Sequence, residues 1–166
     1  MATAKKGARS TSWRKIVASS LGWGQAHATL EAAVDKLPVA LRGTRAKGLP
    51  HSAWELLEHI RRTQADLVDF MTNRKYVAPE WPRDYWPSSP VPPSTRAWFE
   101  CLAAIKADRR RIARLATKAS LDLTRPIPWG DGQTYLRTIL VAQDHESYHT
   151  AQIIFVRRLL GAWTDK

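Results

Sequence analysis

The segment RKYVAPEWPRDYWPSSPVPP, residues 74–93, restricts the architecture of this chain more than any other stretch. Its six prolines exclude an α-helix. A segment of twenty residues without regular structure is uncommon inside a domain and needs a structural reason. At about 3.3 Å per extended residue, it is long enough to follow a helix over its full length. We therefore predict a crossover, which makes the helices before and after it parallel.

Four stretches carry apolar residues at steps of three and four, the period of one buried helix face. In the second stretch, Ser52 is followed three residues later by Glu55, a capping-box pattern that marks a helix start. Trp13 to Leu21 predicts one further short helical turn. No stretch has a convincing strand pattern, so the fold class is all-α, a four-helix bundle. The helices are expected from about Trp23 to Lys36, from the Ser52 cap to about Asn73, from the Ser94 cap to about Lys118, and from about Thr134 to Leu160.

Length and composition indicate one domain in a reducing compartment. The 166 residues suffice for a single hydrophobic core. No apolar stretch approaches the roughly 20 residues that cross a bilayer, so no membrane association is expected. The only cysteine, Cys101, can form no internal disulfide and excludes a Cys-rich zinc site. We expect a cytoplasmic protein.

The charge is strongly basic, with 26 Lys+Arg against 15 Asp+Glu and a net charge of +11. Residues 1–12 are predicted to be a disordered basic lead, and residues 13–166 the single folded domain. Such a charge is compatible with nucleic-acid binding. However, the chain has no helix-turn-helix signature and no aromatic residues interleaved with the basic ones, so nucleic-acid binding is the weakest of the functions considered.

The segment DHESYHTAQ, residues 144–152, places two histidines four residues apart on the fourth helix. At 100° per residue, His145, His149 and Gln152 fall within one buried face. Burying such groups without partners costs about 1–3 kcal/mol each, and one divalent cation would satisfy both imidazoles. On spacing alone, two histidines four residues apart are more often a surface pair or two separate core residues than a metal site.

A third ligand must come from another helix. His59 shares its face of the second helix with Leu56 and Leu67 and is predicted to point into the bundle. By the same test His27 points inward from the first helix, as a pocket residue or a fourth ligand. Gln152 is a candidate hydrogen-bonding residue of the pocket. Asp144 is a candidate for orienting the ligand rings.

Two longer segments, HSAWELLEHIRRTQADLVDFM and GDGQTYLRTILVAQDHESYHTAQIIFVRRLLGAW, resemble the DinB/YfiT-like superfamily of damage-inducible, metal-binding bundles. The resemblance extends from about Trp23 to Trp163 and includes the crossover. It implies an up-down-down-up topology and a divalent metal, often nickel or zinc. The implied ligands are one histidine of the second helix and two of the fourth, which here are His59, His145 and His149.

Three nitrogen ligands leave coordination positions open for water or substrate. They suit nickel and zinc, and also iron or copper. The resemblance implies transferases and isomerases that use small cellular thiols, and hydrolysis is a further possibility. We therefore expect a metal-dependent enzyme acting on a small molecule, a thiol-dependent transferase or a hydrolase, and a homodimer. The alternative is a non-catalytic metal-binding bundle in a stress response.

Overall fold

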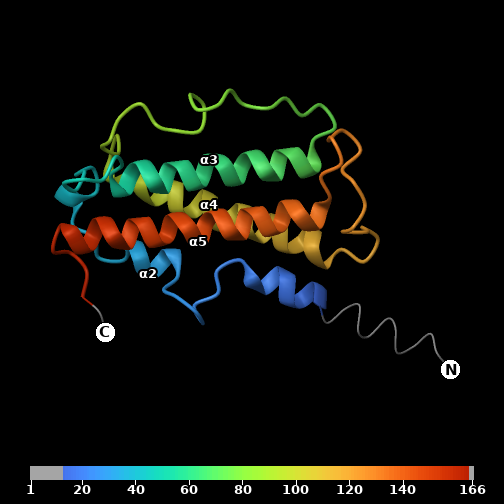
Figure 1. The fold of residues 1–166 in the computed structure, drawn as a ribbon, viewed down its shortest axis with the longest axis horizontal. Helices are drawn as coiled ribbons and strands as arrows, with labels where there is room; N and C mark the ends of the chain where they lie inside the picture. The colour runs from blue at the N-terminus through green and yellow to red at the C-terminus, as the bar shows by residue number, and fades with distance from the viewer. Residues whose placement is uncertain (1–12, 165–166) are drawn as a thin grey trace.

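The computed structural model describes residues 13–164 and is built from helices (Figure 1). Three long helices form its body: α3 (Ala53–Thr72), α4 (Thr95–Thr117) and α5 (Tyr135–Leu159). The short helix α2 (Leu30–Val34) packs against α5, while α3 packs against both α4 and α5. Within residues 13–164 there is no strand, and the all-α prediction is confirmed. Residues 1–12, with the predicted basic lead, lie outside the described residues.

The three long helices begin where the sequence predicts: α3 and α4 at the expected caps Ser52 and Ser94, and α5 at Thr134. The Ser52 hydroxyl accepts from the Glu55 backbone N–H, and the Glu55 carboxylate accepts from the Ser52 backbone N–H, which completes the capping box. Ser94 and Thr134 cap α4 and α5 in the same manner through their hydroxyls. These contacts satisfy backbone donors that have no partner inside a helix.

The crossover at residues 74–93 returns along the bundle from the end of α3 to the start of α4 (Figure 1). As a result α3 and α4 run in the same direction, and α5 runs against both. This is the arrangement that the length of the proline-rich segment requires.

The first predicted helix, Trp23 to Lys36, is wrong. Residues 13–20 are helical, residues 21–29 are not, and helix returns only in α2. Gly22 adopts a φ of +102°, which interrupts the helix, and the Thr29 hydroxyl starts a new one by accepting from the Ala32 N–H. Of the period that predicted this helix, Leu30 and Val34 lie in α2, whereas Trp23 and His27 lie in the non-helical segment before it.

The apolar core consists of two clusters, one toward each end of the long helices. The first includes Leu57 and Ile153, and the second includes Val68 and Ile139. Along α5, the residues between the two clusters include three buried polar side chains: Glu146, His149 and Thr150. A polar layer thus separates the two apolar clusters in the middle of the bundle.

Candidate metal centre

Three histidines from two helices converge in this polar layer. One ligand nitrogen from each of His59, His145 and His149 lies within 4.8 Å of the others. The His59 and His145 Nε2 atoms are 3.0 Å apart. The ring centroids are 4.4 to 4.8 Å apart. The two helices α3 and α5 therefore bring together the three histidines that the sequence singles out.

Two neighbouring oxygen atoms fix the orientation of the rings. The His59 Nδ1 lies 2.9 Å from the Tyr85 carbonyl oxygen in the crossover, and the His149 Nδ1 lies 2.7 Å from the Gln152 Oε1. Because these oxygens only accept, each Nδ1 carries the proton. The Nε2 atom of each ring keeps its lone pair, which is the form that coordinates a metal.

Burial keeps the three imidazoles neutral. It lowers the pKa of His59 to about 4 and that of His145 to about 3, both well below the ordinary value of 6.5. Burial also lowers the pKa of His149, although its hydrogen bond to Gln152 acts in the opposite direction. Neutral rings, two of them with fixed tautomers, are ready to bind a divalent cation without first losing a charge-bearing proton. The donor set therefore fits the divalent metal that the sequence suggests.

Aromatic residues of the crossover cover His59. The Trp86 ring stacks on it with centroids 3.9 Å apart and an angle of 3° between the planes. On the other face of Trp86 lies His51, stacked at 4.0 Å. Trp81 approaches the His59 ring edge-on at 6.4 Å. The sequence does not place His51 near the site, because it lies in the loop before the Ser52 cap and belongs to no helical period.

Hydrogen bonds attach this aromatic cover to α3. The Tyr76 and Tyr85 hydroxyls both donate to the Asp66 carboxylate at 2.8 Å. The Arg62 guanidinium donates to the Asp84 and Trp86 carbonyls. The Tyr85 carbonyl that orients His59 is therefore held in place by side chains of the helix that carries His59.

The other candidate residues lie in different places. Gln152 contacts His149, as described above. Asp144 is exposed on α5. The oxygens that orient the histidine rings belong to Tyr85 and Gln152 rather than to Asp144. The prediction that His27 points into the bundle is wrong, because its helix does not form. His27 is exposed in the loop before α2, with its Nδ1 2.9 Å from the Ala28 carbonyl.

Glu146, the acid next to His145 in sequence, is engaged elsewhere. Its carboxylate makes two hydrogen bonds of 2.7 Å with the Arg109 guanidinium, which also bonds Glu31 at 2.7 Å. Burial raises the pKa of Glu146, while Arg109 acts to lower it. This carboxylate therefore ties helices together and is not free to act as a base at the histidines.

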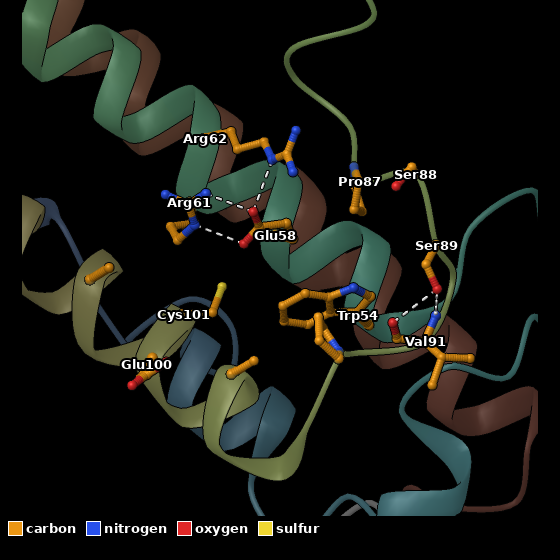
Figure 2. Close-up of a pocket in the computed structure, with 13 residues that line it drawn as sticks. Trp54, Glu58, Arg61, Arg62, Pro87, Ser88, Ser89, Val91, Glu100 and Cys101 are labelled. Atoms are coloured by element: carbon orange, nitrogen blue, oxygen red, sulfur yellow. Dashed lines mark hydrogen bonds and ion pairs between the residues drawn. The ribbon is translucent and has the colours of Figure 1, made fainter.

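A pocket of about 460 Å³ lies between α3, α4 and the crossover (Figure 2). None of the three clustered histidines lines it. Glu58 occupies its wall and accepts hydrogen bonds from Arg61 and Arg62. Cys101 lines the same pocket, but its Sγ is buried near the Leu57 carbonyl, and burial raises the pKa of the thiol. Cys101 thus behaves as a small apolar residue.

A family model of the DinB superfamily matches residues 23–153, well over half of the chain. The chain belongs to the DinB superfamily. A search of curated proteins and a search of solved structures each gave no match. The matched region contains all three clustered histidines. In this DinB-superfamily protein, family membership and the histidine cluster both fit a metal-binding protein.

The described part of this DinB-superfamily protein contains no candidate for a membrane span. None of the helices within residues 13–164 combines the length and the hydrophobicity that a bilayer crossing requires.

Proposed function

We propose that His59, His145 and His149 hold one divalent metal ion and that the protein is an enzyme acting on a small molecule. Nickel and zinc are the favoured ions, with iron and copper also compatible with three imidazoles. The observation that carries the proposal is the convergence of three neutral rings, two of them with Nδ1 bound to an oxygen. Such an arrangement leaves Nε2 lone pairs directed to one place.

When bound, a divalent metal with three nitrogen ligands supplies Lewis-acid activation at its open positions. The residues of the chain contribute orientation and shielding. Tyr85 and Gln152 hold the rings, while Trp86 and Trp81 cover the His59 side from water. Glu146, next to His145 in sequence, is bound to Arg109, so the residues from 13 to 164 offer no obvious general base at the histidines. This favours a reaction in which the substrate is itself a nucleophile with an acidic proton, such as a small thiol.

Metal content is the first test. The protein as purified and after loading with nickel or zinc should hold about one ion per chain. His59→Ala and His149→Ala should each reduce the metal content severalfold, because two ligands bind far more weakly than three. His27→Ala is the matched control, since this histidine is exposed and outside the cluster, and it should keep full metal content. Full metal content in His59→Ala would show that the assigned site is wrong.

Turnover is the second test, and it separates an enzyme from a non-catalytic metal-binding bundle. The loaded protein is incubated with electrophiles and candidate low-molecular-weight thiols, and with ester or amide substrates for the hydrolase alternative. Metal-dependent turnover that disappears in His149→Ala supports the enzyme. Stoichiometric metal without turnover of either class favours the non-catalytic alternative.

A further inference from the structure

We propose that a small apolar pocket beside the histidine cluster binds a short branched aliphatic group of the substrate. This inference rests on the proposed function, because it assigns the part of the substrate that lies next to the metal. The substrate is then a small thiol or similar metal-binding compound that carries a hydrophobic arm of four to five carbons.

The position of the pocket follows from the two antiparallel helices. Leu56, in the pocket, lies three residues before His59 on α3. Gln152, also in the pocket, lies three residues after His149 on α5. Because α3 and α5 run in opposite directions, both steps lead the same way along the bundle (Figure 1). The pocket is thus about one helical turn, ~5 Å, from the ligand histidines.

Two polar residues connect the pocket with the cluster. Gln152 lines the pocket and also accepts from the His149 Nδ1. His51 lines the pocket and stacks on Trp86, which stacks on His59. The His51 Nδ1 is buried without a hydrogen-bond partner. The polar residues of the pocket are therefore the ones that link it to the candidate metal centre.

The remaining walls are apolar. They come from the loop before α3, from α3 and from α5, and consist of Leu49, Pro50, Leu56, Phe155 and Val156. The cavity volume is about 120 Å³. An apolar cavity of ~150 Å³ admits a benzene ring, so this pocket suits a branched group of four to five carbons. A charged or strongly hydrated arm would lose its water against these walls, because Gln152 and His51 are the only polar residues of the lining.

The larger pocket of Figure 2 does not suit the same arm. Glu58, Arg61 and Arg62 line it with charged groups, and none of the three clustered histidines is among its lining residues. Of these two pockets, only the small one combines apolar walls with residues that touch the histidine cluster.

The test compares three probe thiols by calorimetric titration into zinc-loaded protein: ethanethiol, 2-methylpropane-1-thiol and 2-mercaptoethanol. Each buried methylene strengthens binding roughly fourfold. We expect 2-methylpropane-1-thiol to bind roughly tenfold more tightly than ethanethiol, and 2-mercaptoethanol to bind no more tightly than ethanethiol. Equal affinities for the branched and the short thiol would overturn the pocket assignment and leave the metal site standing.

Two exposed α5 side chains give a matched pair of variants. Phe155→Ala removes one wall of the pocket, and Leu140→Ala removes an apolar side chain outside it; both residues are about half exposed, so both variants should fold. The preference for the branched thiol should fall to about twofold in Phe155→Ala and stay near tenfold in Leu140→Ala. An unchanged preference in Phe155→Ala would contradict the proposal.

A measurement without metal separates the two proposals. In the chelator-treated full chain, 2-methylpropan-1-ol should shift the methyl resonances of Leu56 and Val156 and leave those of Leu140 unchanged. If these shifts appear but the zinc-loaded protein binds no thiol, the pocket stands and the thiol-dependent form of the proposed function fails. If the alcohol shifts neither pocket methyl, the pocket assignment is overturned whatever the metal content.

Discussion

At the scale of single residues, the orientation of the candidate ligands depends on two uncharged oxygen atoms. One is the Tyr85 backbone carbonyl, and the other is the Gln152 side-chain amide. Such partners fix the tautomer of a ligating imidazole and hold its ring in place. Neither oxygen changes its charge between acidic and neutral pH, so the tautomers are held without an ionisable neighbour.

Replacing Gln152 tests the importance of this orientation. In Gln152→Leu the His149 Nδ1 loses its acceptor, and the affinity for zinc or nickel should fall by about 10- to 100-fold. Gln152→Glu restores an acceptor at the same position and should recover most of the affinity. Competition with a chromophoric chelator measures both. Unchanged affinity in Gln152→Leu would mean that His149 is oriented by its packing alone.

The sequence predicts the ligand histidines but not their surroundings. His59, His145 and His149 are identified because helix periodicity determines which side chains share a buried face. The contacts of Tyr85, Trp86 and His51 depend on how the crossover folds back onto α3, and no period describes that path. The Tyr85 contact is also made by a backbone carbonyl, which every residue possesses.

At the scale of the elements, one guanidinium connects three helices. Arg109 of α4 bonds Glu146 of α5 and Glu31 of α2. The short helix α2 has five residues and would be marginal alone. Its position therefore depends on its apolar contacts with α5 and on this charged link.

Removing the link should be costly, because it leaves the buried Glu146 carboxylate without a counter-charge. Arg109→Ala is expected to lower the free energy of unfolding by about 3–5 kcal/mol. The control is Arg96→Ala, which breaks an exposed pair with Glu100 and should cost less than about 1 kcal/mol. Urea denaturation of both variants provides the comparison. Equal effects would show that the buried pair contributes no more than an exposed one.

Helix boundaries were predictable where a capping residue marks them. Ser52, Ser94 and Thr134 begin α3, α4 and α5, and Gly161 ends α5 with a φ of +67°. The same reasoning failed between residues 23 and 36. There a short apolar period outweighed the Thr29 cap, which starts the helix only at Leu30.

At the scale of the whole molecule, a polar layer with three neutral histidines lies between two apolar clusters. An unfolded chain would protonate these histidines near pH 6.5, whereas burial lowers the pKa of His59 to about 4 and that of His145 to about 3. Between pH 6.5 and about 4 the unfolded state therefore binds more protons than the folded state. The metal-free protein loses stability as the pH falls through this range.

Urea denaturation of chelator-treated protein at pH 7, 6 and 5 measures this loss. By pH 5 the free energy of unfolding should fall by about 1–2 kcal/mol for each of these buried histidines. His59→Asn removes one titrating group, so its stability should decline less steeply with acidification. A parallel decline in the variant and the parent protein would contradict the assignment of the effect to His59.

The crossover has a kinetic consequence for the candidate site. It carries both the Tyr85 carbonyl and the Trp86 ring, and it is attached to α3 through Asp66 and Arg62. We expect an ion held by the three histidines to be shielded from exchange on the His59 side for as long as these attachments persist. Loosening the crossover, for example by Asp66→Ala, should therefore speed metal exchange without removing any nitrogen ligand.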